Sequence, residues 1–404
     1  MSVRKNALIG LAIIVLCMLL ITQLIGKPTP RKPEGNLTLE AIGKDQETTS
    51  DQPTEIIHLT ATVHLSEIQF EALKERNDRF SKGHPYIQVH LENVDVKQAY
   101  TILKEHAKAG LSSDIMLLDY IWTNEFAASG YLSHELDSYI PMKANDASPY
   151  TVWNGYSWAV PSYYDPYVMV MNNPVFQDYG SYPVTFEEWQ LFQEVYSEGD
   201  QSQSAIYLEA NDPYAFMSLI WSLGEEWGQA ENGMYEIHTA ETVFHNKLFA
   251  PRDYEGKDEQ IPPLVVTDPL LSNEKWKLVS TGIVPAMIIK LSEWRSYMKD
   301  NGANPNLLLK PFDGEGGLCL TGTGYAVSAD SEHQAEAFEW IKAMRQLSSG
   351  PDAEVFSGRS FSADPELYKK MEMLRGTLPL LYEGSMTTEE WNELLVQRWD
   401  NYRY

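Results

Sequence analysis

Hydrophobic and polar residues follow two different periods in the first part of the chain. Residues Glu55–Val63 and Tyr86–Val94 alternate with a period of two, which predicts β-strands, whereas Ser66–Phe80 has the spacing of an amphipathic helix. The same order continues with a helix over Lys97–Ala109 and a short apolar strand over Asp114–Leu118. Strands that alternate with helices of this length predict a parallel sheet with helices on both faces.

A second block of strands and helices follows, from about Tyr182 to Thr281, and it predicts a second lobe. The later elements that we expect are helices over Ile121–Ser129, Phe186–Ser197 and Tyr214–Leu223, a strand over Thr323–Ser328 and an amphipathic helix over Ser331–Leu347. With 404 residues the chain exceeds the ~100 to 200 residues of one typical domain, which also favours two lobes.

The charge balance excludes one large class of partner. The formal net charge is -26, from 57 acidic and 31 basic residues. Because nucleic-acid affinity comes mainly from neutralised phosphates, we expect no nucleic-acid partner. The two cysteines, Cys17 and Cys319, lie in an apolar run and near a predicted strand, and they form neither a disulfide framework nor a zinc motif.

The N-terminus predicts attachment to a membrane. Residues Ala7–Gly26 carry no charge and are about as long as a bilayer span, so we expect residues 1–26 to be an uncleaved anchor. Cleavage with secretion, or lipidation at Cys17, are the alternatives. Residues 27–54 are rich in Pro, Thr, Glu and Gln and predict a disordered tether at the outer face of the cell membrane.

No enzyme motif is evident. The sequence has no G-x-S-x-G elbow, no P-loop, no H-E-x-x-H motif and no EF-hand loop, and its histidines lack metal-ligand spacing. We therefore expect no catalytic residues, no cofactor and no metal. A carbohydrate-active enzyme stays open as an alternative, because two carboxylates suffice for glycoside hydrolysis and the chain has many.

Six segments resemble, in the same order, the family 1 extracellular solute-binding proteins of bacteria, which include maltose-binding protein and other sugar receptors of ABC importers. One is Arg79–Val89, whose part His84-Pro85-Tyr86-Ile87-Gln88-Val89 is similar to the family's H-P-x-I-x-V turn. A second, Ser113–Asp119, departs from the family by having Ser113 at the usual proline. The others lie at Tyr156–Asn172 with Thr185–Trp189, Leu208–Gly224, Gly282–Trp294 and Gly324–Ser328, and the likeness covers Glu55–Leu347.

This resemblance implies an α/β fold of the two-lobe, periplasmic-binding-protein-like kind with three inter-lobe crossings. We expect the crossings near Pro161–Asn172, Thr281–Lys290 and Gly322–Ser328. The expected lobes are residues 55–164 plus 284–324 for lobe 1, and residues 165–283 plus 325–404 for lobe 2. The part of the chain after Gly350 has no counterpart in the resemblance, and either Trp391 or Trp399 could reach the cleft.

The same resemblance implies the substrate-binding subunit of an ABC importer, which captures a sugar or oligosaccharide by hinge closure and delivers it to the transmembrane permease subunits. Aromatic rings and carboxylates suit sugars, and the chain has 11 Trp and 23 Tyr. We expect a monomer. The alternative is a tethered sensor that signals to a partner kinase.

Several residues are candidates for ligand contact by their place in the resemblance or at the carboxyl end of a strand. Asp119 could instead cap a helix, Asp165 could be a solvated hinge acid, and Asp212 has the position of an N-cap. Trp122 and Trp294 could instead be buried. The full set of expected ligand-binding residues is Asp119, Trp122, Tyr163, Tyr164, Asp165, Asp212, Tyr214, Trp294 and Tyr325, with His64 as a weaker candidate.

Overall fold

The computed structural model describes residues 55–134, 136–140, 149–197, 203–223, 226–229, 231–238, 248–249, 252–253, 260–267, 271–310, 319–345 and 361–403. The expected membrane segment, residues 1–26, and the expected tether, residues 27–54, lie outside these ranges. Within these ranges no helix combines the length and the apolar character that a membrane span needs. Residues Gln52–Tyr404 form one compact unit.

The first lobe is built on a five-stranded sheet in the order β2-β1-β3-β16-β6. The strand β1 pairs in parallel with both β2 and β3, whereas β16 is antiparallel to both β3 and β6. Its elements are β1 (Ile57–Val63), α2 (Glu67–Gly83), β2 (Ile87–Asn93), α3 (Ala99–Lys108), β3 (Ile115–Asp119), α4 (Tyr120–Ala128), α5 (Leu136–Tyr139), β4 (Val152–Trp153), β5 (Tyr156–Ser157), β6 (Val160–Tyr164), β16 (Gly322–Val327) and α12 (Gln334–Met344).

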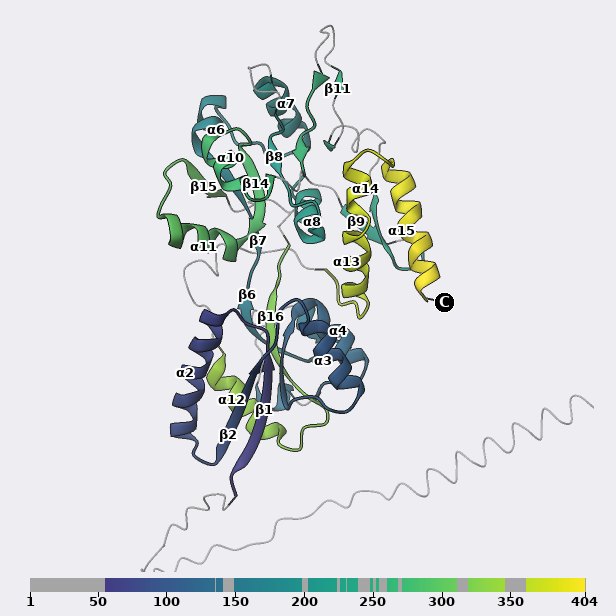
Figure 1. The fold of residues 1–404 in the computed structure, drawn as a ribbon. Coiled ribbons are helices and arrows are strands. Elements are labelled where there is room, and N and C mark those ends of the chain that lie inside the picture. The colour runs from purple at the N-terminus through teal and green to yellow at the C-terminus, as the bar shows by residue number, and fades with distance from the viewer. Residues whose placement is uncertain are drawn as a thin grey trace, which may run out of the picture. The chain divides into compact units, whose positions relative to one another are not determined.

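Helices cover both faces of this sheet, as the sequence pattern predicts (Figure 1). Strand β3 shows the reason, since Ile115 and Leu117 pack with α2 and α12 while Met116 and Leu118 pack with α3 and α4. Helix α2 begins where Ser66 forms a capping box with Gln69. The sheet therefore fixes where the ends of β1, β3 and β16 lie.

The second lobe is built on another five-stranded sheet, in the order β13-β8-β14-β7-β15. Strand β14 is antiparallel to β7 and parallel to β8. Its elements are β7 (Tyr167–Asn172), α6 (Asn173–Tyr179), α7 (Phe186–Ser197), β8 (Ile206–Tyr207), α8 (Pro213–Ser222), β9 (Glu226–Gln229), β10 (Tyr235–His238), β11 (Arg252–Asp253), β12 (Gln260–Ile261), β13 (Val265–Val266), α10 (Lys275–Thr281), β14 (Ala286–Lys290), α11 (Leu291–Asn301) and β15 (Leu307–Lys310).

Three C-terminal helices complete the second lobe: α13 (Leu367–Arg375), α14 (Leu378–Tyr382) and α15 (Thr388–Arg403). Figure 1 shows them as a yellow group beside α8. Trp391 and Trp399 are fully buried in the same core cluster as α8 and β14, and their indoles donate to the carbonyls of Thr377 and Asn232. The expectation that one of them could reach the cleft is wrong, because both rings fill this core.

The division of the chain between the lobes differs from the expected one. Strands β14 and β15, within the expected lobe 1 segment 284–324, pair in the second sheet, and β16 with α12 belongs to the first lobe. The chain thus passes between lobes after β6, between β15 and β16, and between α12 and α13. The crossing expected at Thr281–Lys290 is wrong, because the apolar strand β14 lies inside the second sheet between β8 and β7.

Candidate functional site

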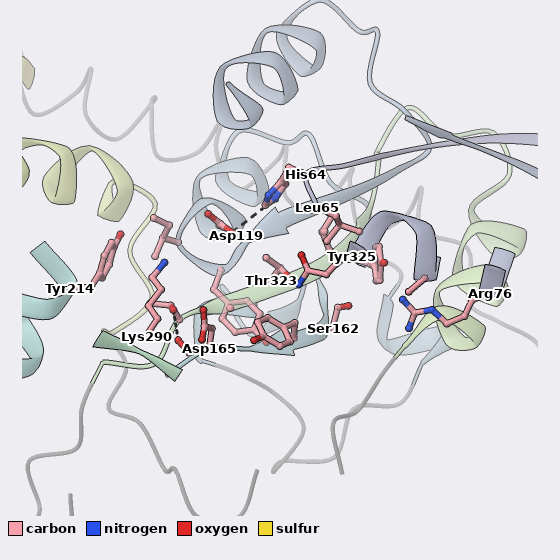
Figure 2. Close-up of a pocket in the computed structure, with 18 residues that line it drawn as sticks. His64, Leu65, Arg76, Asp119, Ser162, Asp165, Tyr214, Lys290, Thr323 and Tyr325 are labelled. Atoms are coloured by element: carbon pink, nitrogen blue, oxygen red, sulfur yellow. Dashed lines mark hydrogen bonds and ion pairs between the residues drawn. The ribbon is translucent and has the colours of Figure 1, made fainter. Parts of the chain in front are cut away.

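A cavity of about 280 Å³ lies where the ends of β1, β3, β6 and β16 meet the second lobe. Most of its wall comes from the first lobe, whereas α8 and β14 of the second lobe contribute Tyr214 and Lys290. Figure 2 shows these two residues at one end of the cavity and Arg76 of α2 at the other. Its volume approaches the ~300 to 1,000 Å³ of typical ligand pockets.

Gly322, at the start of β16, lets the backbone approach two tyrosines of the cavity wall closely. A Cβ atom there would lie 2.2 Å from the carbonyl oxygen of Tyr163 and 2.6 Å from the ring of Tyr120, and the φ angle is +159°. Only glycine fits such a close approach without moving its neighbours. Strand β16 can therefore begin directly beside two tyrosines of the cavity.

Asp119 and His64 form the upper wall of the cavity in Figure 2. The Nε2 atom of His64 lies 4.0 Å from Oδ1 of Asp119, and it is buried without a hydrogen-bond partner among the described residues. Burial lowers the pKa of His64, and the Asp119 carboxylate opposes this shift. Desolvation raises the pKa of Asp119, and the imidazole opposes it. Neutral His64 at physiological pH is therefore a hydrogen-bonding group that faces the cavity.

Four tyrosines give the cavity an aromatic lining: Tyr120, Tyr163, Tyr214 and Tyr325. The hydroxyl of Tyr214 is buried with no hydrogen-bond partner in the part of the chain that the structure describes. Burial raises the pKa of Tyr325 to about 12, so this hydroxyl stays neutral at physiological pH. Aromatic faces beside hydroxyl groups suit a ligand that has both apolar and polar faces.

Asp165 also lines the cavity, but its carboxylate is already engaged. Its Oδ1 accepts from the Ser292 backbone N–H at 2.8 Å, and its Oδ2 accepts from the Ser292 hydroxyl at 2.7 Å. The backbone of Asp165 pairs with Thr321 in both directions. Asp165 thus links two crossings to the start of α11, which gives it a structural role in addition to its place in the wall.

Two cations face the cavity, Arg76 and Lys290. The Nε and Nη1 atoms of Arg76 are buried, and no hydrogen bond or ion pair joins them to any described residue. The ammonium group of Lys290 lies 6.0 Å from the centre of the Tyr167 ring. Sequence reasoning missed both residues, because a lone basic residue within a helix or at a strand end is typical of a solvated surface.

The expected residues divide into two groups. The cavity brings together Asp119, Tyr163, Asp165, Tyr214, Tyr325 and His64. Trp122 and Tyr164 are not in its wall, since the indole of Trp122 is 5% exposed and packs 5.2 Å from the His64 ring, and Tyr164 packs 5.8 Å from the Tyr120 ring. Both support lining residues from behind.

Asp212 and Trp294 also lie outside the cavity wall. Asp212 caps α8 by accepting from the backbone N–H groups of Tyr214 and Ala215, and it accepts the Tyr167 hydroxyl at 2.6 Å. Its N-cap position in the sequence indicated this role. The partly buried ring of Trp294 lies 6.1 Å from that of Trp276, against the core of the second lobe, so packing on this core rather than ligand stacking explains its place.

The described residues contain no group of three or more His, Cys, Asp or Glu side chains placed to hold a metal ion. The cavity offers one carboxylate beside an imidazole and one bonded to Ser292. This arrangement supplies hydrogen-bonding groups and aromatic faces for binding a small molecule.

Comparison with solved structures identifies the fold as one with two α/β lobes. The sugar-binding protein MalE of Xanthomonas citri has a TM-score of 0.70 at 16% identity, with 85% of this chain and 97% of that chain covered. The GacH receptor of Streptomyces glaucescens, solved unliganded and with acarbose, has a TM-score of 0.62 at 18% identity, with 86% and 97% covered. The galacto-N-biose/lacto-N-biose I-binding protein of a Bifidobacterium longum ABC transporter, solved with lacto-N-biose, has a TM-score of 0.60 at 14% identity, with 84% and 95% covered.

No curated protein sequence matches the chain. The family described as bacterial extracellular solute-binding protein matches residues 65–346, which is more than half of the chain. This range includes every residue named above as lining the cavity except His64, which directly precedes it. The chain belongs to the bacterial extracellular solute-binding proteins.

Proposed function

We propose that this chain is the substrate-binding subunit of an ABC importer, and that it captures a sugar or oligosaccharide in the cavity between its lobes. The observation that carries the proposal is a cavity with four tyrosines and unpartnered polar atoms. Sugars present C–H faces that stack on aromatic rings and hydroxyls that bond to polar side chains. The similar structures named above support it, since their names and ligands are those of saccharide-binding proteins.

Capture would work by closure of the two lobes. A ligand held by first-lobe residues and by Tyr214 and Lys290 adds contacts that join the lobes, and it thus shifts the population toward a closed state. The permease then distinguishes the closed form from the open one. Residues 1–26 would hold the protein at the outer face of the cell membrane, and residues 27–54 would give it reach.

A thermal-shift screen of residues 52–404 against oligosaccharides tests the proposal. A ligand that binds only the native state raises the apparent stability by RT ln(1 + [L]/Kd), so a saturating shift with one class of saccharide is the expected result. Asp119→Asn should weaken this binding about tenfold, which is the loss of one charge-assisted hydrogen bond.

Asp178→Asn is the matched control, because Asp178 is an exposed residue of α6 outside the cavity. It should bind like the unaltered protein. Shifts with peptides or polyamines and none with any saccharide would contradict the carbohydrate assignment. Equal losses in both variants would show that the cavity is not the binding site.

A further inference from the structure

The guanidinium group of Arg76 lines the cavity and has no partner among the described residues. Its Nε and Nη1 atoms are buried, and it forms no hydrogen bond or ion pair with any residue that the structure describes. Arg76 is half-buried, so part of its guanidinium group is removed from water without a partner, which carries a desolvation cost. Since the group lines the cavity, the partner that offsets this cost is expected to come from the ligand.

The carboxylates of the cavity do not fill this role. Asp165 is held by Ser292 through both of its oxygens. Asp119 lies beside His64, 4.0 Å away, and in Figure 2 both are separated from Arg76 by Tyr325. Arg76 is therefore an unused cation in a protein whose net charge is -26.

The groups beside Arg76 are neutral hydrogen-bonding hydroxyls. Burial raises the pKa of Tyr325, whereas the positive charge of Arg76 and a hydrogen bond with Ser162 both oppose this rise. Both Ser162 and Tyr325 line the cavity. A guanidinium group beside two hydroxyls supplies donors for a planar anion, and arginine binds carboxylates with two parallel hydrogen bonds.

The charge balance favours a single negative charge on the ligand. The cavity has two cations, Arg76 and Lys290, and two carboxylates, Asp119 and Asp165. A dianion such as a phosphate carries one negative charge more than Arg76 neutralises, inside a strongly acidic protein.

We propose that the ligand is an acidic saccharide, with a uronic acid unit whose carboxylate binds Arg76 beside Tyr325 and Ser162. This inference rests on the proposed function, because it names the class of saccharide that the same cavity takes. The rest of the sugar would lie against the tyrosines toward Tyr214 and Lys290, where Figure 2 shows the other end of the cavity.

Calorimetric titration of residues 52–404 with matched acidic and neutral saccharides tests the inference. The probes are oligomers of galacturonate, glucuronate and mannuronate, each paired with its methyl ester, which keeps the carbon skeleton and removes the charge. We expect one acid to bind at least about tenfold more tightly than its ester, and Arg76→Gln to abolish this preference with a loss of about ten- to a hundredfold for the acid.

Arg79→Gln is the matched control, because Arg79 is exposed on the same helix and, among the described residues, bonds only to the carbonyl of Glu75. It should keep both affinity and preference. Arg76→Lys serves if the Gln variant does not fold, and it should retain part of the preference because it keeps the charge but loses the planar fork.

The outcomes separate the two proposals. Equal binding of acid and ester, or tighter binding of a neutral saccharide, would overturn the acidic ligand and leave the sugar-binding function in place. Tighter binding of a sugar phosphate or sulfate would also overturn it, in favour of another anion. Binding of no saccharide, charged or neutral, would overturn both.

Discussion

Two cations of the protein, Lys275 in the second lobe and Arg76 in the first, differ in their partners. In the second lobe Lys275 is buried between Glu209 at 2.8 Å and Glu293 at 2.7 Å, and Glu209 also accepts from the Ser272 hydroxyl. In the first lobe Arg76 has buried nitrogens and no partner among the described residues. A paired charge holds a fold together, whereas an unpaired one at a cavity is available to a ligand. This difference favours a structural role for the Lys275 cluster and supports the proposed binding role of the cavity wall around Arg76.

The largest effect is expected from the core that joins the C-terminal helices to the second lobe. Trp399→Ala removes a fully buried indole of α15 and should lower the free energy of unfolding by about 3 to 5 kcal/mol. Urea denaturation followed by circular dichroism measures it. Tyr402→Ala is the control, because Tyr402 is 53% exposed on the same helix, and its loss should be much smaller. Equal small losses would show that α15 is not part of this core.

A smaller loss is expected when the paired cation is removed. Lys275→Met leaves Glu209 and Glu293 without their shared partner and should destabilise the protein by about 2 kcal/mol, since both carboxylates keep some contact with solvent. Burial alone lowers the pKa of Lys275, but its hydrogen bonds to the two glutamates outweigh this effect and raise it. Lys277→Met, on the exposed face of the same helix, should cost less. The urea midpoint compares the two variants.

The third effect is a pH dependence that arises at the cavity. Burial lowers the pKa of His64 below the usual value of about 6.5, so the unfolded chain takes up a proton there before the folded protein does. Stability should fall as the pH drops below about 6.5, by at most about 1.4 kcal/mol per pH unit. His64→Gln should remove this part of the slope between pH 7 and pH 5. An unchanged slope would show that His64 titrates alike in both states.

The smallest expected change in stability is that of Arg76→Met, and it is the sharpest contrast with Lys275→Met. Removal of this unpaired, half-buried charge should leave the free energy of unfolding, measured by urea denaturation, unchanged within about 0.5 kcal/mol or raise it. A loss of stability as large as that of the Lys275 variant would mean that Arg76 is a structural residue. The contrast between Arg76 and Lys275 would then fail.

Much of the architecture could be predicted from the sequence, because the period of apolar residues is set by local geometry. The helix at Phe186–Ser197 has the predicted bounds, and β1, α2, β2 and β3 lie within a few residues of theirs. The two-lobe fold and the family are confirmed by the comparisons. The lobe assignment of residues 284–324 was wrong because an apolar strand such as β14 has the same pattern in either sheet.

The residues that line the cavity could be predicted from the sequence only in part. Asp119 and Tyr163 lie at strand ends, where a sheet places ligand-facing residues, and both line the cavity. Trp294 was misplaced because stacking on a ligand and stacking on Trp276 need the same ring. No sequence pattern distinguished Arg76. Its proposed role in ligand binding depends on the absence of a partner among the described residues, and only the folded structure shows which side chains surround it.

The most direct test is one pair of calorimetric titrations with the saccharide that gives the largest thermal shift, on residues 52–404 carrying either Arg76→Met or Lys275→Met. The expected result is that the Arg76 variant keeps its stability and loses at least about tenfold in affinity, whereas the Lys275 variant loses stability and binds within about twofold of the unaltered protein. Unchanged affinity in the Arg76 variant, together with lost affinity in the Lys275 variant, would contradict the assignment of the binding surface to the first-lobe wall.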